Sequence, residues 1–146
     1  LAQALEATGD KERARSLYSQ LREQLAAELK TAAENPDLHA ALGVADAGLG
    51  LAEEAIAEGR KAAELLPVSR DAFTGPVYLF RLAQICVHVG RKDQAIDLLQ
   101  QLFAIPAGNV ISPALLKIDP IWDPLRGDAR FEKLVNDSYK PIEPKS

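Results

Sequence analysis

The sequence has no methionine, one cysteine, one tryptophan and only 5% aromatic residues among 146. The single cysteine, Cys86, excludes an internal disulfide and a zinc site built from several cysteines. No apolar run reaches the roughly 18 residues that a membrane span needs. A formal net charge of −4 argues against the basic surface with which proteins bind a phosphate backbone. The missing initiator predicts a processed product or an excised part of a longer protein.

Alanine and leucine dominate what is present, with 24 and 21 residues. Both residue types favour helix, whereas a β-sandwich or barrel would need more β-branched and aromatic residues. The length suffices for one domain with its own hydrophobic core. The composition therefore predicts a single all-α domain over residues 1–146.

A repeat runs through the first two thirds of the chain. Three glycines are separated by 41 and 40 residues, and an alanine follows each of them five residues later. Repeats of this length are typical of stacked helical units. The glycines are Gly9, Gly50 and Gly90, and the alanines are Ala14, Ala55 and Ala95.

Apolar residues at three- and four-residue steps flank these glycines and predict amphipathic helices. We expect three antiparallel helix hairpins, the first containing a long helix over 11–34. A C-terminal helical cap and a frayed tail follow. The expected boundaries are about 1–35, 36–67 and 75–106 for the hairpins, 112–138 for the cap and 139–146 for the tail.

Within the cap, three dipeptides pair an N-cap residue with a proline suited to the first helical position. They are Ser112-Pro113, Asp119-Pro120 and Asp123-Pro124. We expect them to begin short helical pieces, and a closing helix to begin at Asp128. The single tryptophan, Trp122, is expected to pack onto the last hairpin.

The recurring small residues have a physical explanation. Two antiparallel helices approach closely only where a side chain is small, so Ala55 is expected opposite Gly43, and Ala95 opposite Ala83. One hairpin cannot bury its whole apolar face, and neighbouring hairpins must therefore stack into an α-solenoid.

The repeats resemble the tetratricopeptide repeat (TPR), with its pattern W-x2-L-G-x2-Y, A-x3-F and P. The second repeat matches at Leu42, Gly43, Gly50, Ala55 and Pro67. His39, Asp46 and Gly59 stand where the family usually has aromatics, and the period exceeds 34 residues by six or seven. The resemblance implies a right-handed superhelix. The third repeat matches at Leu79, Leu82, Ala83, Cys86, Gly90, Ala95 and Leu99.

Residues 36–136 further resemble the C-terminal region of large bacterial TPR proteins. In those proteins the region follows a serine/threonine kinase, a cyclase, a TolB-like or a winged-helix domain. There the segment D-P-x-W-D-P-L-R, here 119–126, closes the solenoid. This resemblance implies a regulatory or scaffolding part of a larger bacterial protein, without catalytic activity of its own.

In TPR folds the first helix of each hairpin lines a concave face. The resemblance and the helical spacing together predict a groove for a protein or peptide partner, suited to a helix or an extended apolar segment. The alternative is a groove filled by the protein's own segments. The expected groove residues are Ala40, Val44, Ala47, Phe80, Arg81, Gln84, Val87 and His88, with Gln3 and Glu6 from the first repeat. This set lacks the lysines and asparagine with which some family members clamp a C-terminal carboxylate.

Other chemistry finds little support in the sequence. His39 and His88 have no cysteine or histidine at ligand spacing, so we expect no metal. Cys86 lies among apolar positions and is expected to be buried. Helix capping explains Asp119 and Asp123 without a catalytic carboxylate pair. We therefore expect no enzyme, no cofactor and no nucleic-acid partner, and a location in the cytoplasm.

A second functional possibility concerns the long helix over 11–34. Its apolar positions Leu17, Leu21, Leu25 and Leu29 need an apolar neighbour that residues 1–8 are too short to supply. Uncovered patches of this size usually mark an interface. We expect either more solenoid before Leu1 or self-association of the isolated chain, for instance as a homodimer.

Overall fold

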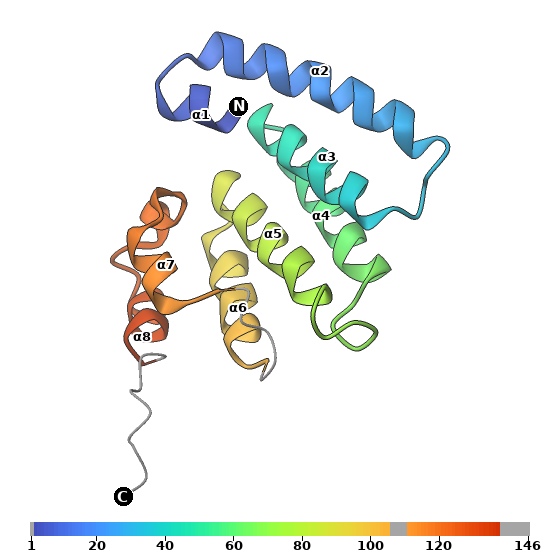
Figure 1. The fold of residues 1–146 in the computed structure, drawn as a ribbon. Coiled ribbons are helices and arrows are strands. Elements are labelled where there is room, and N and C mark those ends of the chain that lie inside the picture. The colour runs from blue at the N-terminus through green and yellow to red at the C-terminus, as the bar shows by residue number, and fades with distance from the viewer. Residues whose placement is uncertain (1, 106–110, 138–146) are drawn as a thin grey trace, which may run out of the picture.

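The computed structural model describes residues 2–105 and 111–137, and these residues form helices, turns and loops without a strand. Figure 1 shows the helices following one another as antiparallel pairs, with the cap beside α5 and α6. The helices are α1 (Ala2–Ala7), α2 (Lys11–Leu29), α3 (Pro36–Gly48), α4 (Ala52–Leu65), α5 (Gly75–His88), α6 (Lys92–Phe103), α7 (Pro113–Ile118), the 3₁₀ helix η1 (Pro120–Leu125) and α8 (Ala129–Asp137).

Three helix connections share one turn geometry. Gly9, Gly50 and Gly90 have φ values of +87°, +79° and +78°, a left-handed conformation that glycine adopts without steric cost. The next N–H in each turn donates to a carbonyl five residues back. These bonds join Asp10 to Leu5, Leu51 to Asp46 and Arg91 to Cys86, at 2.9, 2.9 and 2.7 Å. The recurrence of the glycines is thus a recurrence of one helix-ending turn.

Side-chain caps begin several helices, and two of these caps, at Ser112 and Asp119, are at residues that the sequence predicts. The Asn35 carboxamide accepts from the backbone N–H groups of Asp37 and Leu38, with Pro36 in the first turn. Ser112 and Asp119 cap α7 and η1 in the same way. The expectation for Asp123-Pro124 is wrong, because Pro124 lies inside η1 and the Asp123 carboxylate instead pairs with Arg126.

From α1 to α6, successive helices pack against each other, ending with the pair α5 and α6. In addition, α3 contacts α5. Close contact depends on small residues. A Cβ atom built on Gly43 would lie 2.9 Å from the Ala55 carbonyl oxygen, so Gly43 faces Ala55 as predicted. Ala83 and Ala95 are both fully buried in the largest core cluster.

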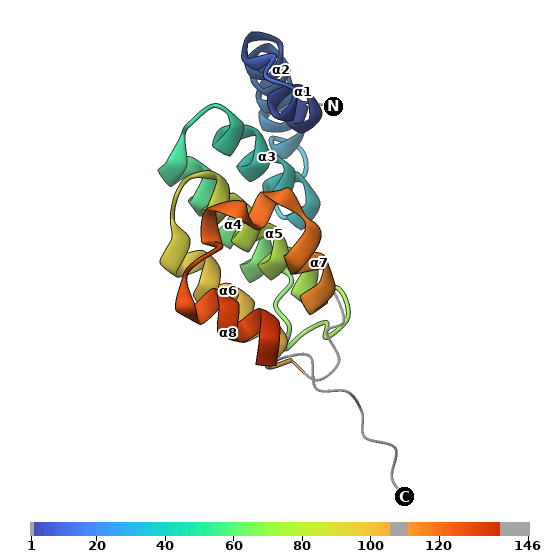
Figure 2. The same cartoon turned by 90° about the vertical axis from the view of Figure 1, so that its left-hand side faces the viewer.

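The cap is an integral part of that core. Trp122, Leu125 and Phe131 are almost completely buried in it. The Trp122 ring lies against Phe80 of α5, with centroids 5.7 Å apart and planes tilted by 47°, which confirms that the tryptophan packs onto the last hairpin. Figure 2 shows α7 and the following segment crossing over the side of α5, where η1 makes its contacts.

The long helix of the first hairpin, α2, is shorter than predicted. It ends at Leu29, after which Lys30, Thr31 and Ala32 make turn-like hydrogen bonds to the last carbonyls of α2. The expectation of helix to residue 34 is therefore wrong, because the chain turns to reach the Asn35 cap. The predicted frayed tail over 139–146 lies outside the described residues.

None of the helices in the described ranges combines the length and the apolar character that crossing a membrane requires.

Candidate functional site

A cleft of about 490 Å³ lies where α1, α5 and the connection from α7 to η1 meet. These three segments are far apart in sequence, and all three contribute side chains that line the cleft. Clefts of this size between packed elements are the usual places for ligands. The lining residues are Gln3, Glu6 and Ala7 from α1, Arg81, Gln84 and His88 from α5, and Asp119, Pro120 and Ile121 from the cap.

The position of each lining side chain follows from helix geometry. Arg81, Gln84 and His88 are spaced by three and four residues, so they share one face of α5. The neighbouring positions Leu82, Ala83, Ile85 and Cys86 are buried in the core. In α1, Ala2 and Leu5 pack against the cluster containing Tyr18, which leaves Gln3 and Glu6 to line the cleft.

The inner end of the cleft is narrow and mainly apolar. It is a void of about 10 Å³, large enough for roughly one water molecule. Gln3, Gln84 and His88 reach it as well, so amide and imidazole groups border an apolar floor. That floor consists of Val44, Ala47, Ile85 and Ile121.

Glu6 is the best-connected group of the cleft. Its carboxylate accepts a hydrogen bond from the Tyr18 hydroxyl at 3.1 Å, and its other oxygen lies 3.4 Å from His88 Nε2. Burial of the phenol raises the pKa of Tyr18 well above its usual value, and the negative Glu6 raises this pKa further. Glu6 thereby ties α1 to both α2 and α5.

The other two charged groups of the cleft, Asp119 and Arg81, differ in their hydrogen-bond partners. Asp119 accepts the Ile121 N–H at 3.1 Å and caps η1. Arg81 makes one long hydrogen bond to Gln84, at 3.4 Å. Within the described part of the chain, no carboxylate lies within 4.0 Å of the Arg81 guanidinium, since none of the ion pairs involves this residue.

The structure divides the expected groove residues into three groups. Arg81, Gln84 and His88 line the cleft, and Val44 and Ala47 border its inner end. Three residues lie elsewhere. Ala40 packs in a separate cluster with Ala62 and Tyr78, Phe80 lies against Trp122, and Val87 is buried in the core.

Phe80 does not line the cleft, because the cap already covers the part of α5 to which Phe80 belongs. Asp119, Pro120 and Ile121 consequently form one wall of the cleft. Their place in this wall could not be predicted from the sequence, because helix capping already accounts for the segment. Pro120 is exposed and Ile121 is half-buried. Nothing in the sequence at these two positions indicates that they line a cleft.

The expected self-association face on α2 is not a continuous exposed surface. Leu25 is buried and Leu17 and Leu29 are half-buried, while Leu21 is 38% exposed. The expectation that residues 1–8 leave the whole stripe uncovered is therefore wrong for Leu25, because α3 packs along α2.

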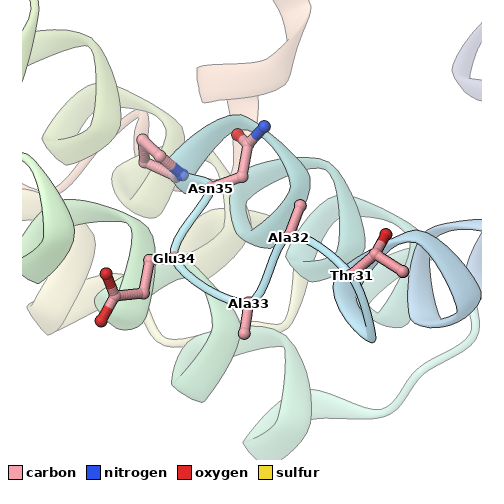
Figure 3. Close-up of a pocket in the computed structure, with 6 residues that line it drawn as sticks. Thr31, Ala32, Ala33, Glu34 and Asn35 are labelled. Atoms are coloured by element: carbon pink, nitrogen blue, oxygen red, sulfur yellow. The ribbon is translucent and has the colours of Figure 1, made fainter.

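A second concavity, of about 590 Å³, follows the connection between α2 and α3. Figure 3 shows Thr31, Ala32, Ala33, Glu34 and Asn35 around it, with side chains that point in different directions. All six lining residues are consecutive in the sequence, from Thr31 to Pro36. A single loop without converging polar groups has none of the features of a built ligand site.

Neither histidine belongs to a cluster of metal ligands. His39 Nδ1 lies 2.5 Å from a Glu58 oxygen and its Nε2 lies 2.9 Å from the Ala33 carbonyl oxygen. His88 Nε2 pairs with Glu6, at 3.4 Å. In residues 2–105 and 111–137, no three His, Cys, Asp or Glu side chains gather as a metal ion would require. Cys86 is a free, buried thiol, and burial raises its pKa.

No family model, curated protein sequence or solved structure matches this chain.

Proposed function

We propose that this chain is a non-catalytic, TPR-like interaction module that binds a short peptide segment of a partner protein. The cleft between α1, α5 and the cap carries this proposal, because it joins an apolar inner end to a polar rim. A rim of this kind suits the backbone of a peptide, and an apolar floor suits one of its side chains.

The TPR-like part of the proposal rests on two further observations. Three connections share the same positive-φ glycine turn, and the close approach at Gly43 and Ala55 lets the two helices of one hairpin, α3 and α4, pack tightly. By its resemblance to the C-terminal region of bacterial TPR proteins, we place the module in a regulatory or scaffolding part of a larger protein.

The cap restricts what the module binds. Because Trp122 and Leu125 are buried in the core, we expect the cap to stay in place when a ligand binds in the cleft beside it. A short extended segment or the end of a helix fits such a cleft better than a long helix does. Self-association through α2 has less support, since Leu21 is the only one of its four leucines classed as exposed.

A random peptide library tests this function. Gln84→Trp places a bulky ring in the cleft, because Gln84 borders both the cleft and its inner end. Gln100→Trp adds the same ring to an exposed position of α6 and is the matched control. We expect the unmodified chain and Q100W to enrich binding peptides, and Q84W to lose them. Equal enrichment by Q84W would refute binding in the cleft.

A further inference from the structure

The charged side chains of the cleft differ in the hydrogen-bond and ion-pair partners that they have within the chain. This difference indicates what kind of peptide the cleft accepts. The four charged or titratable groups are Glu6, Arg81, His88 and Asp119. Glu6 contacts the Tyr18 hydroxyl and His88. Asp119 is occupied in capping η1. Among the residues that the structure describes, Arg81 has only the long bond to the neutral Gln84.

A guanidinium satisfies its donors best with a carboxylate, which accepts two parallel hydrogen bonds. Arg81 is solvent-exposed at the edge of the cleft, so binding a carboxylate there does not first require the loss of an existing ion pair. Glu6 and Asp119 already have donors, and a basic ligand would have to compete with them. Of the charged groups in the cleft, Arg81 is therefore the one that a negatively charged group of a ligand would pair with.

The apolar floor gives the second requirement. Gln84 and His88, which lie three and seven residues beyond Arg81 on α5, border this floor. Seven residues of helix span roughly 10 Å, the length of about three residues of an extended chain. The inner void accepts only a small group, because its volume is about 10 Å³.

We infer that the cleft selects a partner segment in which an acidic side chain pairs with Arg81 and a small apolar residue, within about three positions of it, enters the floor. This inference rests on the proposed function, since it specifies the peptide that the same cleft binds. The carboxylate belongs to a side chain within the segment and not to a chain terminus.

Three pools of fluorescent heptapeptides test the charge preference. Each pool has randomised Ala, Val, Ser and Gly around a central Glu, Gln or Lys, and each is amidated at its C-terminus. We expect the Glu pool to bind about tenfold more tightly than the Gln pool by fluorescence polarisation, and the Lys pool to bind most weakly. The advantage of Glu should shrink as salt is raised, since exposed ion pairs are screened.

Two variants assign this preference to one residue. Arg81→Gln should bring the Glu and Gln pools to equal affinity. Arg15→Gln, at an exposed arginine of α2, should leave the tenfold difference intact. A fourth pool, with central Gln and a free C-terminus, supplies a terminal carboxylate. Binding of this pool as tight as that of the Glu pool would overturn the assignment to a side chain.

The outcomes separate the inference from the function on which it rests. If Glu and Gln pools bind equally and Q84W abolishes both, the cleft binds peptides but does not select acidic ones, and this inference alone fails. If R15Q and R81Q reduce binding of the Glu pool equally, Arg81 has no special role. If no pool binds and the random library yields no peptide either, both proposals fail.

Discussion

Gly48 and Tyr18 are in such close contact that a Cβ atom built on the glycine would lie 2.3 Å from the tyrosine ring. The positive φ of the following turn belongs to Gly50 and not to Gly48. Gly48 is the last residue of α3, and its missing side chain makes room for a ring that α2 supplies.

Gly48→Ala should therefore destabilise the fold even though alanine favours helix by up to about 1 kcal/mol over glycine. The ring of Tyr18 is buried and its hydroxyl is bound to Glu6, so it cannot easily move aside. We expect a loss of about 1–2 kcal/mol in the free energy of unfolding, measured with urea. In a Tyr18→Leu background the same substitution should cost much less. An equal cost in both backgrounds would show that Tyr18 is not the cause.

The α3–α4 contact gives a second prediction. Ala55 is fully buried, and its backbone meets Gly43. Ala55→Leu adds three heavy atoms where the helices are already in contact, and should lower the free energy of unfolding by about 1–3 kcal/mol. Ala57→Leu, at an exposed position of the same helix, should change it by less than about 0.5 kcal/mol. If the two variants melt at the same temperature, the close packing of α3 on α4 is wrong.

Much of the fold could be predicted from the sequence, because local rules decide it. The glycines at Gly9, Gly50 and Gly90, and the caps at Ser112 and Asp119, act within a few residues of their own positions. Contacts between segments that are far apart in the sequence were harder to predict. Helical spacing and the TPR resemblance place Arg81, Gln84 and His88 on one face, and these residues do line one cleft, but neither signal could show that the cap covers Phe80.

The burial of the Asp46 carboxylate could not be predicted from the sequence either, where the only signal is an aspartate at a position that is usually aromatic in the TPR pattern. Asp46 is 2% exposed, and its Oδ1 accepts a hydrogen bond from Arg22 Nε at 2.6 Å. Arg22 is 24 residues earlier, on α2. Periodicity alone does not indicate which residue on a neighbouring helix will meet such a group.

Asp46 gives a prediction about pH. Burial raises the pKa of this carboxyl above its usual value, although the Arg22 hydrogen bond and charge lower it in part. Because the folded pKa lies above the unfolded one, protonation favours the folded chain. The contribution is full below the unfolded pKa and is lost as pH rises through the folded pKa. Relative to Asp46→Asn, the natural chain should therefore gain free energy of unfolding as pH falls from 7 to 4.

Urea titrations of the two proteins at pH 7, 5.5 and 4 measure this difference directly, because the other titrating groups are common to both. Asp128→Asn is the opposite control. Its pKa is lowered, chiefly by hydrogen bonds from Arg130, so the natural chain should lose stability relative to D128N as pH falls. The same trend in both pairs would contradict the burial argument for Asp46.

The contact between Phe80 and Trp122 predicts how firmly the cap is attached. Trp122 is 1% exposed and is the only tryptophan, so its fluorescence reports on the cap alone. Phe80→Ala removes the ring packed against it, and should shift the emission to longer wavelength and lower the free energy of unfolding by about 2–3 kcal/mol. Phe73→Ala removes the same ring from a position that is 81% exposed, and should change neither quantity. If F80A leaves the emission unchanged, the indole is shielded by other residues, and Phe80 would again be available to line a groove.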